Sequence, residues 1–469
     1  MRRFICGSLA FASVLAAGEG ARASRPRYGG TLAVATAGTI ASAAALVTPA
    51  ESAESGVASR LAGLVFETLV AADESGGIRP LLATAWQKDA GSARWRFRLR
   101  ADVVMHDGVL LDAARAAAAL RATEARWTIT IDGDSLVVGL PAERADFLGE
   151  LAAARHAIAV RTASGAPIGS GPFQIERVDA GRLVLRAHDG YWGGRPFVDR
   201  VDVQMGRMPA DQRADLEAGR VDLASIQLTD VRRIVQRGLR VVATRPLDVY
   251  VLAFEPHRAG SATESSRHAL SAAIDRAAMC AVLLQNYCEP AASLLPAWIT
   301  GYAPLFAERK SPAPRNRVPQ PTGEKGLTLR VDPADPLAQT IADRIAVDAR
   351  EAGWSIAIQA PSGLAPRADL RLLRVRIVAA AAQRSLDAAV DALGARLVAL
   401  AAADLPASSP SIDVVYPRER ALLEHAVIVP VVRVPDVYGV GELVETSRGP
   451  LVGPDGAWNL ADVWKRPRP

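Results

Sequence analysis

The fold class is decided by residues 327–358, which read LTLRVDPADPLAQTIADRIAVDAREAGWSIAI. Apolar side chains alternate over 327–331 and again over 354–358, with the period of a β-strand. Between them Asp335 is placed to cap a helix, apolar residues recur at helical spacing, and Gly353 is placed to end it. A strand, a helix and a second strand in this order form a β-α-β crossover, which joins parallel strands. We therefore expect an α/β lobe here.

The N-terminal third carries a different pattern, which predicts a β-hairpin. Residues 127–131 and 135–140 read as two strands around Asp132-Gly133-Asp134, and a turn of this composition favours a hairpin. The two carboxylates also have the oxygen chemistry of a cation site, but the turn explains them more simply. We expect a small α+β unit in this region.

The first residues have the layout of a cleaved signal peptide. Arg2 and Arg3 precede an apolar stretch over 4–17, and Ala21-Arg22-Ala23 stands directly before Ser24. A charged start, a short apolar segment and small residues at the cleavage position are typical of exported chains. The alternative, a membrane anchor, needs a longer apolar stretch to cross about 30 Å of hydrocarbon. We expect the mature chain to begin at Ser24.

The composition is that of a soluble globular protein with a small net charge. The chain has 469 residues, 50% of them hydrophobic and 22% charged, and this length predicts several lobes. Removal of residues 1–23 lowers the formal net charge from +5 to +3. Because the arginines are spread among acids and are not gathered with aromatic residues, the sequence argues against a nucleic-acid partner.

Two cysteines, Cys280 and Cys288, remain in the expected mature chain. An oxidising compartment would allow a disulfide between them, which would close a short loop and contribute about 2–3 kcal/mol. Free buried cysteines are also common, and the sequence does not say whether the two side chains face each other. Both alternatives stay open at this stage.

No arrangement for catalysis or metal binding stands out. Ser170 lies between two glycines, but Pro172 follows it and no helix begins there, so a tight turn is favoured over a nucleophile. The six histidines are spread without the i, i+4 pairing that places two imidazoles on one metal. The sequence also lacks the glycine motifs that bind phosphate or dinucleotides. It indicates a binding protein without catalytic residues, metal or cofactor.

Spaced segments along nearly the whole chain match one family pattern in order and approximate spacing. They are Tyr28-Gly-Gly-Thr-Leu32, Val65-Phe-Glu-Thr-Leu-Val70, Gly77-Ile-Arg-Pro-Leu-Leu-Ala-Thr-Ala-Trp86, Trp95-Arg-Phe-Arg-Leu-Arg100, Met105-His-Asp-Gly108, Gly169-Ser-Gly-Pro-Phe173, Tyr191-Trp-Gly-Gly-Arg-Pro196, Glu217-Ala-Gly-Arg-Val-Asp-Leu223, Arg267-His-Ala-Leu-Ser-Ala-Ala-Ile-Asp-Arg276 and Trp458-Asn-Leu-Ala-Asp-Val-Trp464. With these segments the chain resembles the extracellular solute-binding proteins of family 5, the oligopeptide-, dipeptide- and nickel-binding components of ABC importers.

The resemblance implies an α/β fold of the periplasmic-binding-protein type (type II, cluster C), with two lobes around a ligand cleft and a small inserted α+β subdomain. The expected parts are a signal peptide, a discontinuous lobe I, the inserted subdomain II and lobe III. Their expected bounds are 1–23 for the signal peptide; 24–57, 168–253 and 430–469 for lobe I; 58–167 for subdomain II; and 254–429 for lobe III. Closure would be a hinge motion at the chain crossings near residues 254 and 430.

Candidate ligand-binding residues follow from their positions in this pattern. Thr36 and Thr39 follow the first strand, Tyr250 and Phe254 lie on the strand that enters lobe III, and Tyr438 follows the late return to lobe I. For each of them, simple packing or a solvated turn is the alternative. Peptide-binding members of the family also carry in lobe III an aspartate for the ligand amino end, and residues 369–403 contain no such acid cluster.

The resemblance implies an extracytoplasmic, periplasmic protein, a monomer that captures a peptide or peptide-sized solute and delivers it to ABC permease subunits. A signalling or chaperone-like protein that presents a ligand with the same fold is the alternative from another class. A hydrolase that uses Ser170, or a metal site assembled from distant segments, is the enzyme alternative, and the sequence disfavours it. Because the acid for a peptide amino end is missing, peptide is here the default of the family.

Overall fold

The computed structural model describes residues 25–47, 56–73, 77–162, 165–255, 263–306, 326–359, 368–377, 381–408, 412–453 and 456–467. The expected signal peptide, residues 1–23, and the expected mature start at Ser24 lie outside the described residues. Within the described part of the chain, no helix is long and apolar enough to cross a membrane.

One mixed sheet of 11 strands runs through the molecule. Its strands are β1 (Thr31–Ala35), β10 (Phe173–Asp179), β11 (Arg182–Ala187), β12 (Arg200–Gln204), β13 (Leu223–Ser225), β14 (Arg240–Phe254), β15 (Glu289–Pro290), β16 (Leu327–Arg330), β17 (Ile356–Gln359), β18 (Leu370–Arg376) and β19 (Ile428–Val440). The strand order is β10-β11-β12-β1-β13-β19-β14-β18-β16-β17, with β15 beside β19. The first five strands belong to lobe I and the last three to lobe III, so β14 and β19 connect the lobes.

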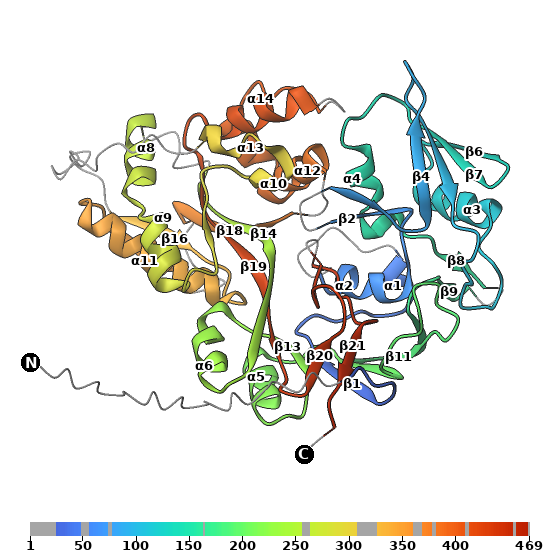
Figure 1. The fold of residues 1–469 in the computed structure, drawn as a ribbon. Helices are drawn as coiled ribbons and strands as arrows, with labels where there is room; N and C mark the ends of the chain where they lie inside the picture. Colours follow the sequence, from blue (N-terminus) through green and yellow to red (C-terminus); the bar gives the residue numbers. More distant parts are fainter. Residues whose placement is uncertain are drawn as a thin grey trace, which may run out of the picture.

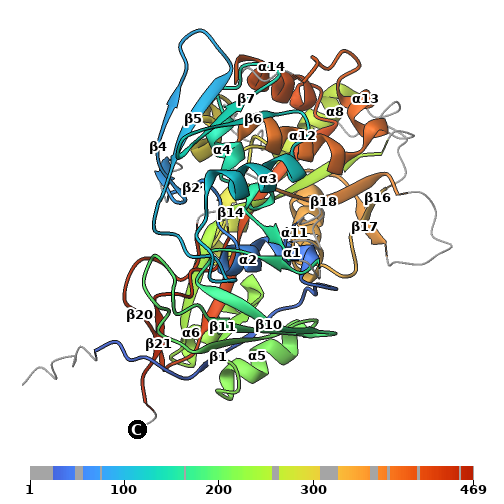
Figure 2. The same ribbon diagram turned by 90° about the vertical axis from the view of Figure 1, so that its right-hand side faces the viewer.

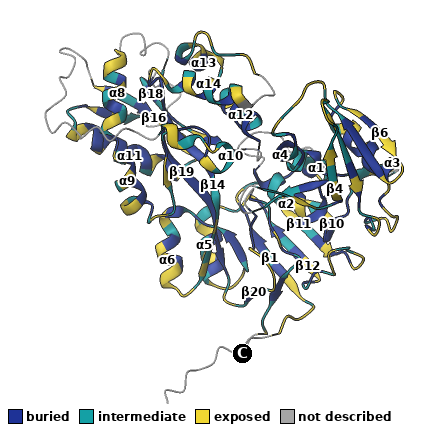
Figure 3. Ribbon diagram, turned by 45° about the horizontal axis from the view of Figure 1, so that its top comes forward, coloured by how far each residue is buried: buried dark blue, intermediate teal, exposed yellow. Residues whose placement is uncertain are grey.

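The two connecting strands lie side by side and antiparallel along the centre of the molecule (Figure 1). Their pairing is irregular between Ala243 and Asp248, around Pro246, which is opposite Pro435. Every residue of β19 is buried, and β14 is buried from Leu247 onward (Figure 3). The irregular pairing near Pro246 and Pro435 lies inside both strands, and the crossings expected near residues 254 and 430 stay a prediction.

The predicted β-α-β crossover is confirmed. Strands β16 and β17 are parallel, with Leu327 opposite Ile356, and α11 (Pro336–Glu351) joins them. Asp335 caps this helix, because its carboxylate accepts hydrogen bonds from the backbone N–H groups of Leu337 and Ala338, both at 3.1 Å. The remaining helices of lobe III include α8 (Glu264–Ala273), α12 (Ala382–Leu393), α13 (Ala395–Ala401) and α14 (Ile412–Leu423).

The predicted hairpin is also confirmed. Strands β6 (Thr128–Asp132) and β7 (Ser135–Gly139) pair antiparallel, and β4 (Ala83–Lys88) and β5 (Arg94–Leu99) complete a separate sheet in the order β4-β5-β7-β6. Helix α3 (Ala113–Thr123) packs against β6 and β7. Figure 2, which brings the right-hand side of Figure 1 forward, shows this unit as a body beside the main sheet.

The buried residues form three hydrophobic cores. The core of subdomain II runs from Leu69 to Ile158, and the core of lobe I includes the buried face of α2 (Gly56–Val65). The third core contains the apolar residues of lobe III, apolar residues of β14 (249–254) and of β19 (between 428 and 437), and also Ala35 and residues between 216 and 234 of the expected lobe I. The expected bounds remain a proposal, and this packing favours a subdomain II that begins near Leu69 instead of residue 58.

Several family segments meet around Glu67, directly after α2. The buried Glu67 carboxylate accepts hydrogen bonds from Ser170 Oγ at 2.7 Å, Tyr191 OH at 3.0 Å and Trp192 Nε1 at 3.0 Å. Burial raises the pKa of Glu67. The Ser170 hydroxyl is fully buried and donates to this carboxylate, so it stabilises the turn in which Ser170 lies. This arrangement argues against Ser170 as a nucleophile.

The glycines on either side of Ser170 let two backbone segments touch. A Cβ atom at Gly169 would lie 2.0 Å from the carbonyl oxygen of Val65, and one at Gly171 would lie 2.7 Å from the carbonyl carbon of the same residue. The Gly171 N–H donates to that carbonyl oxygen at 3.0 Å. This contact holds the C-terminal end of α2 against the 169–173 turn.

Cys280 and Cys288 are joined by a disulfide in the structure, with their Cα atoms 5.3 Å apart. The bridge closes the loop that follows the short helix α9 (Arg276–Ala278), in lobe III.

Candidate binding cleft

A cavity of about 160 Å³ lies where lobes I and III meet beside the connecting strands. Its wall is built from both lobes. The residues that line it are Thr36, Ala37, Gly38, Arg60, Ser225, Gln227, Leu228, Leu337, Arg374, Val434, Pro435, Asp436, Val437 and Tyr438. We call this space the hinge cavity.

The lobe I wall of the hinge cavity is formed at the carboxyl ends of two parallel strands. Strands β1 and β13 are neighbours, with Val34 opposite Leu223. Thr36 directly follows β1, and Ser225 is the last residue of β13. In α/β sheets ligands bind in the crevice outside the carboxyl ends of parallel strands, so the cavity lies where this class of fold places a ligand.

The floor of the hinge cavity is a network of ion pairs that spans both lobes. Asp436, on β19, accepts hydrogen bonds from Arg60 of α2 at 3.0 Å and from Arg376 of β18 at 2.7 and 3.3 Å. Arg376 also bonds Asp248 of β14 at 3.1 Å, and Arg374 bonds the same carboxylate at 2.6 Å. The guanidinium groups of Arg376 and Arg60 hold the pKa of Asp436 far below its usual value, although burial acts in the opposite direction.

A second layer positions the network from lobe III. The Tyr250 hydroxyl donates to Asp335 Oδ2 at 2.6 Å, while Asp335 Oδ1 caps α11. Arg374 Nη1 lies 3.9 Å from Asp335 Oδ2, the oxygen to which the Tyr250 hydroxyl donates. Burial raises the pKa of Tyr250, so the phenol stays protonated and keeps donating.

Two hydroxyl groups of the cavity wall, Thr36 Oγ1 and Ser225 Oγ, are buried and have no hydrogen-bond partner among the described residues. The Tyr438 hydroxyl is hydrogen-bonded to the Trp458 side chain. Thr36 and Tyr438 are each 1% exposed. A buried polar group without a partner costs free energy, of the order of 1–3 kcal/mol. The hydroxyls of Thr36 and Ser225 are therefore ready to bind a polar group that enters the cavity.

The structure brings two of the five predicted ligand-binding residues together at the cavity. Thr36 and Tyr438 line it, while Tyr250 lies behind it and supports Asp335. Thr39 is exposed and faces the loop at Gly206, outside the lining. Phe254 is 1% exposed in the hydrophobic core of lobe III. Thr39 and Phe254 thus lie outside the lining of this cavity, and their role in ligand binding stays a prediction.

The charged residues of the cavity were missed by sequence reasoning. Residues 369–403 carry no acid cluster, but Arg374 and Arg376 alternate at the end of β18, which also contains Arg371. That alternation puts both guanidinium groups on one face of β18, opposite Tyr250 and Asp248. The sequence around Arg60 and Asp436 does not indicate a site, because these two residues contact each other only in the folded chain.

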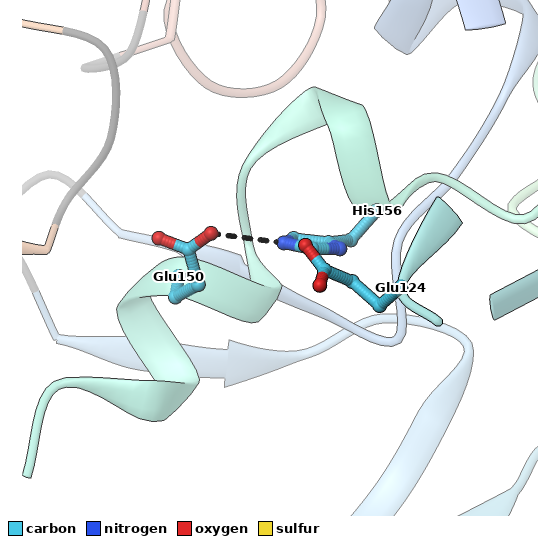
Figure 4. A group of neighbouring side chains, drawn as sticks. All are labelled: Glu124, Glu150 and His156. Atoms are coloured by element: carbon cyan, nitrogen blue, oxygen red, sulfur yellow. Dashed lines mark hydrogen bonds and ion pairs between the residues drawn. The ribbon is translucent and has the colours of Figure 1, made fainter. Parts of the chain in front are cut away.

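One group of acids and histidine within the described residues is close enough to hold a metal ion, and it lies in subdomain II (Figure 4). Glu124, Glu150 and His156 each offer one ligand atom, all within 4.8 Å of one another. Arg155 bonds both carboxylates, at 2.9 Å to Glu124 and more closely to Glu150. The Arg155 guanidinium already supplies positive charge between the two acids, so the group forms a buried ion-pair cluster, in which Glu150 Oε2 and His156 Nδ1 have no hydrogen-bond partner among the described residues.

Comparison with known proteins finds similarity to solute-binding proteins. Residues 77–365 match the model of "Bacterial extracellular solute-binding proteins, family 5 Middle". The peptide transport periplasmic protein SapA of Salmonella typhimurium is 31% identical over 135 residues, 28% of this chain and 24% of that protein. The nickel-binding periplasmic protein of Escherichia coli is 25% identical over 244 residues, 45% of this chain and 47% of that protein. The matched region thus spans less than half of either curated relative.

A solved structure of low sequence identity extends the likeness of fold to nearly the whole chain. The oligopeptide-binding protein AppA of Bacillus subtilis, solved in complex with a nonapeptide, is similar with a TM-score of 0.65 and 15% sequence identity. The similarity covers 94% of this chain and 100% of that one. The expected fold class, a two-lobed periplasmic-binding-protein fold with an inserted subdomain, is confirmed by this likeness.

Proposed function

The chain belongs to the bacterial extracellular solute-binding proteins of family 5, and from that membership we propose that it is the substrate-binding component of an ABC transporter. It captures a peptide or peptide-sized solute in the cleft between lobes I and III and delivers it to permease subunits in the membrane. It works outside the cytoplasm, in the periplasm, as a monomer whose signal peptide has been removed by cleavage.

The observation that carries this proposal is the hinge cavity. Its wall is shared by two lobes that are linked through β14 and β19, so a ligand in the cavity would contact both lobes and favour closure. The cavity, at about 160 Å³, is smaller than the roughly 300–1,000 Å³ of pockets that enclose a drug-sized ligand. It holds one end of a ligand, and the rest extends into the cleft.

Binding is tested by thermal unfolding of the mature chain with pools of di- to pentapeptides, Ni²⁺ complexes and sugars. A ligand at 100 times its Kd adds about 2.7 kcal/mol to the stability of the folded state. Saturable stabilisation by one of these classes is the expected result. A folded protein that responds to none of them, by thermal shift or by native mass spectrometry, contradicts solute capture.

Two threonines of the same loop provide a matched pair of variants. Thr36→Val removes a hydroxyl that lines the cavity, and Thr39→Val removes one that is exposed outside it. We expect Thr36→Val to lower ligand affinity at least about threefold without loss of stability, because its hydroxyl has no partner in the unliganded protein. Thr39→Val should bind as the wild type does. Equal binding by both variants would place the ligand elsewhere.

A further inference from the structure

The carboxylates around the hinge cavity are already committed to partners within the protein. Three of the roughly four acceptor positions of Asp436 are taken by Arg60 and Arg376. Asp248 is bonded by Arg374 and Arg376, and Asp335 by Tyr250 and the first turn of α11. The acids near the cavity are thus mostly occupied by arginine and tyrosine partners, which leaves few acceptor positions for the ammonium group of a ligand.

Hydrogen-bond donors, in contrast, are in excess at the cavity. The buried hydroxyls of Thr36 and Ser225, which can each donate one hydrogen bond, lack partners among the described residues, as does Nε of Arg60, which can only donate. Arg374 is 39% exposed and bonds Asp248 through one terminal nitrogen, while its other terminal nitrogen is 3.9 Å from the nearer Asp335 oxygen, beyond hydrogen-bond range. The group that fits this site carries several acceptors.

The charges of the lining favour the same sign of ligand. Two guanidinium groups, of Arg60 and Arg374, and one carboxylate, of Asp436, line the cavity. A carboxylate is compact enough for a space of about 160 Å³. It presents two oxygens and forms the stronger, charge-assisted class of hydrogen bond with the guanidinium groups of the lining.

We propose that the hinge cavity binds a ligand carboxylate, held from lobe I by Thr36 and Ser225 and from lobe III by Arg374. This inference rests on the proposed function and names the chemical class of its ligand. The site is thus selective for a carboxylate-bearing solute at its hinge end and does not require a ligand amino group there. Because the donors come from both lobes, the carboxylate also links the lobes when they close.

Matched ligand pairs test the proposal. The probes are short peptides with a free C-terminal carboxylate, the same peptides as C-terminal amides, and the same peptides acetylated at the amino end. For metal complexes the pair is Ni²⁺ with histidine against Ni²⁺ with imidazole, which lacks the carboxylate. Isothermal titration of the mature chain should show about a tenfold to hundredfold weaker binding when the carboxylate is removed, and less than threefold when the amino end is acetylated.

The outcomes separate this inference from the proposed function. Amides that bind within twofold of the acids, or acetylation as the change that abolishes binding, would overturn the carboxylate site and leave solute capture standing. Failure of every probe to bind a folded protein would overturn both. The pair that responds, peptide or nickel complex, identifies the source of the carboxylate.

Variants locate the effect in the cavity. Thr36→Val and Ser225→Ala should reduce the preference for acid over amide by about tenfold each, with the affinity for the amide little changed. Both variants keep all charges of the ion-pair network, so they are expected to fold, which a thermal unfolding curve checks. Thr39→Val should keep the full preference. An unchanged preference in both cavity variants would show that the carboxylate binds at another place.

Discussion

His106 should make the stability of this protein depend on pH between neutrality and about pH 4. Its Nε2 lies 3.0 Å from the Gly171 carbonyl oxygen, and its Nδ1 accepts a hydrogen bond from the Gly169 N–H at 3.3 Å. This geometry requires the neutral imidazole with the proton on Nε2. A second proton, on Nδ1, would face the N–H group that now donates to it.

The size of the effect follows from the pKa. Burial lowers the pKa of His106 from 6.5 to about 4, although the hydrogen bond to Gly171 acts in the opposite direction. At about 1.36 kcal/mol per pKa unit this corresponds to roughly 3 kcal/mol. The unfolded chain takes up a proton near pH 6.5 and the folded chain only near pH 4. The stabilisation is therefore complete above pH 6.5 and is lost as the pH falls through this window.

Urea unfolding of the wild type and of His106→Gln between pH 7.5 and pH 4.5 measures this contribution. Glutamine keeps a donor and an acceptor but does not titrate, so the variant should be less stable at pH 7.5 and should lose less stability on acidification, by about 2–3 kcal/mol. His188, which packs edge-on against His106, is present in both proteins. Parallel pH profiles of the two proteins would refute the argument.

Three further changes test other parts of the structure. Asp436→Asn should lower the free energy of unfolding by about 3–5 kcal/mol at neutral pH, because it leaves buried guanidinium groups without their acid. This difference from wild type, measured by urea unfolding, should shrink as the pH falls below 3.8. A difference that stays constant with pH would contradict the network. Gly169→Ala should impair folding, whereas Gly63→Ala in α2, whose Cβ would have an ordinary contact at 3.7 Å, should not; circular dichroism and solubility compare them, and equal behaviour would contradict the close approach. Cys280→Ser should lower stability by about 2–3 kcal/mol under oxidising conditions, and should leave Cys288 reactive toward a thiol reagent, while an unreactive Cys288 would argue against the bridge.

The elements that the sequence predicts correctly are those with a local cause. The crossover over 327–358 carries its cap, its apolar stripe and its two alternating strands within one short stretch. The hairpin at Asp132-Gly133-Asp134 likewise needs only neighbouring residues. In both cases the pattern that identifies the element is also the one that stabilises it.

The site was predicted less completely because its parts come together only through distant contacts. Tyr250 and Phe254 lie on one strand that is buried along its whole lobe III half, so alternation could not separate a side chain that supports the cavity from one that fills the core. Arg60 and Asp436, which are 376 residues apart, meet through the packing of α2 against β19. The spacing of residues within a single sequence does not predict such a contact.

The core of lobe I imposes an order on folding. It contains Leu32 from the first strand and Val463 from the last, and Lys465 near the end of the chain donates to Asp222 at 2.8 Å. Contacts between such distant residues form late, because a long loop has to close first. The core of lobe I therefore needs residues from both ends of the described chain before it can close, whereas the crossover of lobe III is built from one short stretch.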